Sequence, residues 1–140
     1  MPDMSRRQFL ALAATLSAVG AWAQSTAATS TISRRERRDL YPEGVASGDP
    51  TPDTVILWTR YPSPAGKTAT LAIEIAEDPA FERVVASSVA KAEAQSDWTC
   101  RVLVGHLRAS TTYWYRFTDQ NGAGSRIGRT RTAPLDHVSY

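Results

Sequence analysis

Cysteine and histidine are scarce in this 140-residue chain, which contains only Cys100, His106 and His137. A single cysteine excludes an internal disulfide and a cysteine-based zinc site. Metal-assisted hydrolysis needs clustered Asp, His and Asn ligands, and the chain has no D-x-H, G-N-H or H-x-x-x-H run. Asp49 and Asp53 flank prolines, where turn formation explains them. The sequence therefore predicts no catalytic residue, no metal ligand and no cofactor held by this chain.

An excess of basic charge is also missing from most of the chain. Residues 1–40 hold six Arg and three acids, a net of +3, whereas residues 41–140 hold ten Lys or Arg and eleven acids, a net of −1. Nucleic-acid binding requires a basic patch on one face of a domain, so we expect no nucleic-acid partner. No Gly-rich loop precedes a helix, which excludes a phosphate-binding loop of that kind.

Long hydrophobic runs are absent too, because the apolar run Leu10–Ala23 has only about 14 residues and is too short to span a bilayer comfortably. It follows Ser5-Arg6-Arg7-Gln8-Phe9-Leu10 and ends in Ala21-Trp22-Ala23, which fits signal peptidase cleavage after Ala23. An amphipathic core helix is the alternative, but the run has no polar face.

The leader resembles a twin-arginine (Tat) signal, read by an export receptor through Arg6, Arg7, Phe9 and Leu10. Cleavage would use Ala21 and Ala23. Residues 1–23 are thus expected to form a helical signal peptide, with the Tat receptor as a partner, no transmembrane span in the mature form, and a periplasmic or secreted product. Residues 24–40 are rich in Ser, Thr, Ala and then charge, which predicts a disordered linker that buries no core.

From Tyr41 onward the sequence predicts short strands separated by turns. The expected strands are Gly44–Gly48, Val55–Arg60, Thr70–Glu77, Phe81–Val89, Trp98–Val104, Tyr113–Phe117 and Arg126–Thr132. About seven strands in a domain of this size, over residues 41–135, favour an all-β, immunoglobulin-like or fibronectin type III-like β-sandwich.

Alternation assigns faces to several of these strands. Leu71, Ile73 and Ile75 are expected in the core, with Glu74 reaching water. Cys100 shares a face with Val102 and Val104 and is interpreted as a buried hydrophobe. Tyr113 is placed at a tyrosine corner, its hydroxyl returning to upstream backbone. The β-branched and aromatic strand Val55–Arg60 is expected to be buried, with Trp58 in the core.

Exposed residues suggest one candidate surface. Trp114 and Arg116 should point away from Tyr113, Tyr115 and Phe117. Three more arginines are also expected to be exposed: Arg60, Arg129 and Arg131. We take Gly48, Asp49, Arg60, Trp114 and Arg116 as a hypothetical domain-docking surface. The alternative is an outward strand face that long side chains merely solvate.

Several motifs resemble a known family. The run Gly44-Val45-Ala46-Ser47-Gly48-Asp49-Pro50, followed by Leu57-Trp58-Thr59-Arg60, is similar to the start of the N-terminal domain of PhoD-like alkaline phosphatases, the alkaline phosphatase D family. Asp78-Pro79-x-Phe81 and Gly128-Arg129-Thr130-Arg131-Thr132-Ala133-Pro134 are similar to later stretches. The resemblance covers nearly all of residues 41–134.

The resemblance implies a larger enzyme. In that family the sandwich precedes a calcineurin-like metallophosphatase domain that hydrolyses phosphomonoesters and phosphodiesters with calcium and iron. Residues 136–140 would begin that domain, so we expect a fragment or truncated gene product in which the catalytic domain is a missing partner. The chain would be an accessory domain that packs on the catalytic domain and shapes its entrance. A free-standing extracytoplasmic module for glycan or protein is the alternative, and a self-contained enzyme is a third.

Overall fold

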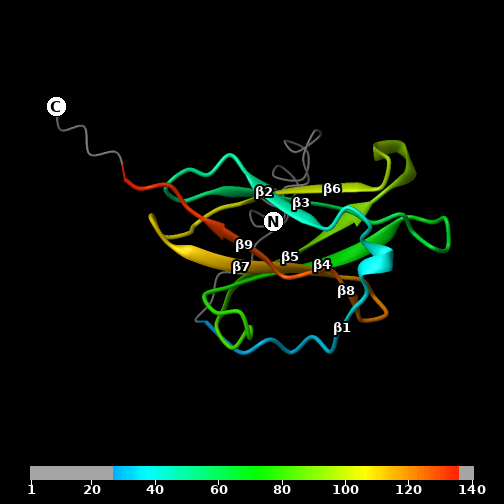
Figure 1. Ribbon diagram of the computed structural model, residues 1–140, viewed down its shortest axis with the longest axis horizontal. Helices are drawn as coiled ribbons and strands as arrows, with labels where there is room; N and C mark the ends of the chain where they lie inside the picture. Colours follow the sequence, from blue (N-terminus) through cyan, green and yellow to red (C-terminus); the bar gives the residue numbers. More distant parts are fainter. Residues whose placement is uncertain (1–26, 136–140) are drawn as a thin grey trace, which may run out of the picture.

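Two β-sheets face each other in the computed structural model, which describes residues 27–135 (Figure 1). The strands are β1 (Arg35–Glu36), β2 (Val45–Gly48), β3 (Val55–Arg60), β4 (Ala69–Ala76), β5 (Val84–Ala92), β6 (Thr99–Val104), β7 (Thr112–Thr118), β8 (Ala123–Gly124) and β9 (Gly128–Arg131). Two short 3-10 turns, η1 (Arg38–Leu40) and η2 (Ala94–Ser96), complete the elements of this part of the chain.

One sheet has three strands in the order β2-β3-β6. The other has the order β1-β8-β7-β4-β5, with β9 also paired to β7. The sheets form the upper and lower layers in Figure 1. The predicted all-β sandwich is confirmed, and strands β2 to β7 and β9 correspond to the seven that the sequence predicts.

The fourth predicted strand begins later than expected, at Val84 rather than Phe81. The Asp78 carboxylate accepts hydrogen bonds from the backbone N–H groups of Glu82 and Arg83, at 3.0 and 2.8 Å. Phe81 has a φ of 55° and is fully buried. These contacts fix residues 78–83 as a turn, because an Asp side chain can replace backbone partners there.

The core lies between the sheets and is built by alternation. Each of the central strands points every second side chain inward, as the period of a strand requires. The inward sets are Val55, Leu57 and Thr59 on β3; Leu71, Ile73 and Ile75 on β4; Cys100, Val102 and Val104 on β6; Tyr113, Tyr115 and Phe117 on β7. The predicted faces of β4, β6 and β7 are confirmed for these residues.

The expected burial of Trp58 is wrong. Strand β3 alternates between buried and partly exposed residues, and Trp58 shares the outer face with Ile56 and Arg60. Strand composition suggested burial throughout, whereas the sheet buries β3 on one face only. The inward hydroxyl of Thr59 is accommodated because it donates to the Gly44 carbonyl at 2.7 Å.

The tyrosine corner forms as expected. The Arg108 backbone N–H donates to the Tyr113 hydroxyl oxygen at 2.9 Å. This bond ties the loop before β7 to the buried ring of Tyr113. It fixes the approach of the chain to the sheet without a disulfide.

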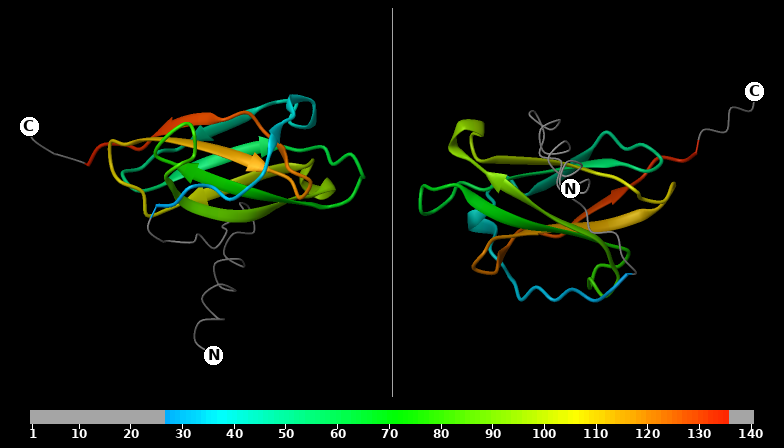
Figure 2. Two further views of the ribbon diagram at one scale, coloured as in Figure 1. Left: turned by 90° about the horizontal axis from the view of Figure 1, so that it is seen from below. Right: turned by 180° about the vertical axis from the view of Figure 1, so that it is seen from behind.

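Residues 27–40, which we call the strap, cross the outer face of the larger sheet (Figure 2). Ala28 pairs with Val84 at the β5 edge, and β1 pairs in parallel with β8 at the opposite side. The expectation of a disordered linker is therefore wrong for this segment. Its composition lacks apolar periodicity because it covers polar groups of the sheet rather than the core. No helix within residues 27–135 is long and apolar enough to cross a membrane.

Candidate functional site

Beneath the strap, Glu74 and Arg116 form a buried ion pair. They lie opposite each other on β4 and β7, with 2.9 Å between guanidinium and carboxylate. Ser30 of the strap donates to Glu74 at 2.5 Å and accepts from Arg116 at 3.0 Å. The Arg116 guanidinium also lies 3.8 Å from the centre of the Phe81 ring. Glu74 and Arg116 were both expected to be exposed to water. That expectation is wrong, because the strap covers this face of the sheet and buries both side chains.

Arg34 anchors the other end of the strap. Its side chain passes over Gly124, donating to the Thr118 hydroxyl at 3.2 Å and to the Ser125 carbonyl. A Cβ on Gly124 would collide with the guanidinium, so Arg34 keeps this position only while residue 124 is glycine. Burial, and secondarily the nearby Arg116 charge, lower the pKa of Arg34.

The hypothetical docking residues do not lie on one face. Arg60 is on the outer face of the three-stranded sheet, where it bonds Glu43 and Asp97 at 3.2 and 3.3 Å. Trp114 is partly exposed on the opposite sheet, and Arg116 is buried there under the strap. Gly48 and Asp49 are exposed at the end of β2. The prediction that Arg116 lies on the surface is therefore wrong, because its guanidinium is buried and paired with Glu74.

A different group does form one continuous surface, the outer face of the three-stranded sheet. Cross-strand register sets Gly48, Ile56 and Leu103 in one row, and Ala46, Trp58 and Arg101 in the next. We call these six residues the docking face. Ala46 and Gly48 are small and exposed, and Ile56 and Trp58 opposite them are partly exposed. Strand alternation applied strictly to β3 could have identified this face from the sequence.

The described chain leaves the sandwich beside the turn that joins β2 to β3. The Ala133 backbone N–H donates to the Thr51 carbonyl at 3.0 Å, and the Ala133 carbonyl accepts from Ser110 at 3.0 Å. These bonds hold the segment after β9 against the end of the three-stranded sheet, at the left of Figure 1. The segment after β9 therefore passes beside the β2–β3 turn, which begins directly after Gly48.

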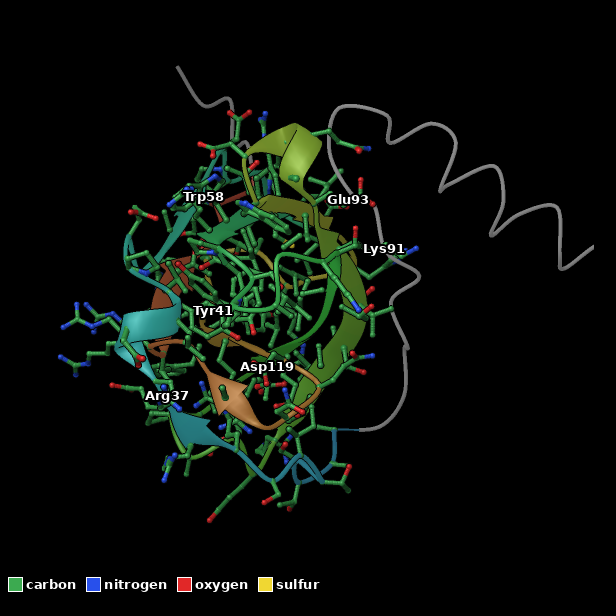
Figure 3. The ribbon with its side chains drawn as sticks, turned by 90° about the vertical axis from the view of Figure 1, so that its right-hand side faces the viewer. Arg37, Tyr41, Trp58, Lys91, Glu93 and Asp119 are labelled. Carbon is green, nitrogen blue, oxygen red and sulfur yellow. The ribbon has the colours of Figure 1, made fainter. Side chains whose placement is uncertain are left out.

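A cavity of about 670 Å³ opens at the other end of the sandwich, between the strap, the β3–β4 loop and the β7–β8 turn. Figure 3 faces this end and shows Arg37, Tyr41 and Asp119 there. We call this cavity the strap pocket. Its wall includes Arg34, Arg35 and Arg37 from the strap, Lys67 from the loop, and Asp119 and Asn121 from the turn. No feature of the sequence pointed to this pocket, because its walls come from three distant segments.

Asp119 organises the turn at the pocket. Its carboxylate accepts from the Tyr61 hydroxyl at 2.7 Å, and from the backbone N–H groups of Asn121 and Ala123 at 2.8 and 2.9 Å. The Tyr41 hydroxyl donates to the Ala123 carbonyl at 2.8 Å. Burial, together with the bond to the nearby carboxylate, raises the pKa of Tyr61. Asp119 is therefore fully engaged in structure.

The acidic, histidine and cysteine side chains of this part of the chain lie apart from one another. Within residues 27–135, no three His, Cys, Asp or Glu side chains form a group that could hold a metal ion. Cys100 is buried, and burial raises the pKa of its thiol to about 12, which disfavours the nucleophilic thiolate form. His106 is exposed in a loop. His137 and the leader residues Arg6, Arg7, Phe9, Leu10, Ala21 and Ala23 lie outside the described residues.

Comparison with known proteins decides the family. The family model for the PhoD-like phosphatase N-terminal domain matches residues 24–134. The chain belongs to this family. The PhoD-like match begins before Tyr41, in agreement with a strap that is part of the domain.

Relatives of this PhoD-like domain are much longer proteins. Alkaline phosphatase D of Bacillus subtilis (strain 168) is 33% identical over 98 residues, which are 65% of this chain and 17% of that protein. The solved structure of PhoD superposes with a TM-score of 0.65 at 30% identity, over 71% of this chain and 20% of that one. The chain thus spans about a fifth or less of these relatives.

A further solved structure shares only the fold with this PhoD-like domain. It is the sensor domain of the anti-sigma factor RsgI4 from Pseudobacteroides cellulosolvens, with a TM-score of 0.53 and 15% identity over 65% of this chain. The match covers 94% of that solved sensor domain.

Proposed function

We propose that this chain is the accessory N-terminal domain of an exported PhoD-like phosphatase, which acts on phosphomonoesters and phosphodiesters. The domain packs against a metal-dependent catalytic domain through the docking face and borders the entrance of its site. The observation that carries the proposal is the position of the chain after β9. Ala133 is bonded to Thr51, next to Gly48 and at one end of the docking face.

The character of the docking face supports this role. Ile56, Trp58 and Leu103 form an apolar centre, with Arg101 beside Trp58. Aromatic residues and Arg are enriched at the centres of interfaces between domains and proteins. Arg60 contributes indirectly, because its bonds to Glu43 and Asp97 brace the loops at the far end of β3.

The metal chemistry of such an enzyme belongs to the partner domain in this proposal. The family implies calcium and iron, but residues 27–135 contain no group of acidic, His or Cys side chains that fits either ion. We therefore derive no catalytic step from these residues. The full chain alone is expected to hydrolyse neither an aryl phosphate nor an aryl phosphodiester with calcium and iron present.

Association tests the docking role. The full chain is mixed with a separately prepared catalytic domain of a PhoD-like phosphatase, and sedimentation is measured with hydrolysis of an aryl phosphodiester. We expect a complex that Ile56→Lys weakens. Val89→Lys is the matched control, because Val89 is 60% exposed on β5, in the other sheet. Equal weakening by both variants, or no complex at all, would favour the free-standing module for glycan or protein.

Export through the Tat receptor, to the periplasm or the medium, is part of the proposal. Replacing Arg6 and Arg7 together by Lys keeps the charge but removes the planar guanidinium groups. The precursor should then accumulate in the cytoplasm, measured by fractionation and by mass spectrometry of the new N-terminus after Ala23. Unchanged processing of the Lys variant would instead indicate an ordinary secretory signal.

A further inference from the structure

We propose that the strap pocket binds an anionic sugar or polyol, with a phosphate or carboxylate group held by Arg35 and Lys67. This site is separate from the docking face. It lies at the end of the sandwich away from the segment after β9, so the two proposals can fail independently.

Charge is the first argument. The pocket wall contains four cationic side chains, Arg34, Arg35, Arg37 and Lys67, against the single carboxylate of Asp119, a net of +3. Arg37 is paired with Asp39 at 2.8 Å, which reduces the net charge to +2. A concave surface lined by one sign of charge concentrates ligands of the opposite sign.

Arg34 supplies the second and independent argument. Arg34 borders the pocket, and its half-buried guanidinium extends past the wall to neutral hydrogen-bond partners among residues 27–135, the Thr118 hydroxyl and the Ser125 carbonyl. Arg116, the nearest buried cation, is already matched by Glu74. No carboxylate among residues 27–135 hydrogen-bonds to Arg34, and burial and the Arg116 charge outweigh the attraction of Glu36 and Glu74. A partly buried charge is unfavourable unless it is paired, so an anion in the pocket would stabilise Arg34.

The exposed cations can reach such an anion. Arg35 from the strap and Lys67 from the β3–β4 loop both line the pocket and are exposed, and within residues 27–135 neither side chain forms a hydrogen bond or ion pair. Arg35 is held in place by its backbone, since its N–H donates to the Gly122 carbonyl at 2.8 Å. Charge-assisted hydrogen bonds from Arg and Lys to phosphate or carboxylate are among the strongest in proteins.

Pocket size and the remaining donors define the rest of the ligand. A cavity of about 670 Å³ is far larger than one inorganic ion requires and fits a small organic molecule. Neutral hydrogen-bonding side chains surround the cations: Ser33, Ser63, Thr68, Thr70, Gln120 and Asn121. Hydroxyl and amide groups in this number match a hydroxyl-rich skeleton that carries the anion.

The test uses the full 140-residue chain, labelled for NMR, and three probes: glucose 6-phosphate, glucuronate and neutral glucose. We expect the two anions to shift the amides of Lys67, Asn121 and Gly122, with affinity falling as salt rises. Comparing the two anions shows whether phosphate or carboxylate is preferred. Equal binding of glucose, or no shift with either anion, would overturn the proposal.

Paired variants test the assigned residues. Arg35→Gln with Lys67→Gln should weaken anion binding about tenfold or more, which corresponds to about 1.4 kcal/mol. The control is Arg108→Gln with Arg129→Gln, which removes the same charge from exposed residues outside the pocket. Both pairs are exposed, and thermal unfolding verifies that each variant is folded. Equal loss in both pairs would show that net charge, rather than the pocket, attracts the ligand.

Discussion

Arg116 and Glu74 face each other across β7 and β4 with 10% and 6% of their side chains exposed, and Ser30 of the strap bonds to both. The pair lies on the side of the sheet that would meet water if the strap were absent. The strap therefore converts a surface ion pair into a buried one.

Removing one partner should destabilise the domain strongly. Arg116→Leu leaves the Glu74 carboxylate buried without its cation, and such a change typically costs about 3–5 kcal/mol. The free energy of unfolding is measured by urea titration. The double variant Arg116→Leu with Glu74→Leu should recover much of this loss, since no unpaired charge remains. A single variant as stable as the parent would show that the strap does not exclude water.

Filling the space above Gly124 should release the strap. Gly124→Ala places a Cβ where the Arg34 guanidinium passes, so Arg34 loses its bonds to Thr118 and Ser125. We expect a loss of about 1–3 kcal/mol, and faster proteolysis within residues 27–40. Gly48→Ala is the control, because a Cβ there meets nothing within 4 Å. Equal protease resistance in both variants would contradict the placement of Arg34.

Strand β3 allows two neighbouring residues to be compared. Leu57 is fully buried, whereas Trp58 is on the outer face. Leu57→Ala should cost about 2–5 kcal/mol because it leaves a cavity. Trp58→Ala should cost less, about 1 kcal/mol, since Trp58 is only partly buried and lies outside the core. Thermal unfolding of both variants gives the order, and the reverse order would invert the faces of β3.

Cys100 should make stability depend on alkaline pH. Burial raises the pKa of its thiol from 9.0 to about 12. Between these values the unfolded chain loses the thiol proton and the folded chain keeps it, so stability falls as pH rises from about 9 to 12. The slope is at most about 1.4 kcal/mol per pH unit. Urea midpoints at pH 8 and 10.5 measure it.

The control for this titration is Cys100→Ala, which should show a flatter decline over the same range. Tyr41 and Tyr61, whose pKa values burial also raises, continue to contribute in the variant. Native Cys100 should resist alkylation by iodoacetamide at pH 8 and react only in urea. Rapid alkylation of the folded chain would contradict its burial.

The sandwich could be predicted because its core obeys short-range rules. Leu71, Ile73 and Ile75 alternate within β4, and Cys100, Val102 and Val104 do so within β6, so local pattern was sufficient. The composition of β3 alone predicts that Trp58 is buried, whereas the alternation along this strand places it on the outer face. Strict use of the two-residue period would have put it outside.

The strap and its pocket could not be predicted in the same way. Arg34 donates hydrogen bonds to Thr118 and Ser125, which lie 84 and 91 residues further along the chain. The residues around Arg34 in the sequence show no periodic pattern of apolar side chains. Such a segment is polar because the surface that it covers is polar. A disordered linker and a polar strap therefore have the same composition, and only the partner groups distinguish them.

The contact between Ser30 and Arg116 also sets an order of events in synthesis. The two residues are 86 positions apart, while Glu74 and Arg116 are separated by 42. The growing chain must therefore keep both the strap and Glu74 in water until β7 has been made. Closing so long a loop is slow relative to local pairing. The first residues of this domain to leave the ribosome are consequently among the last to reach their native contacts.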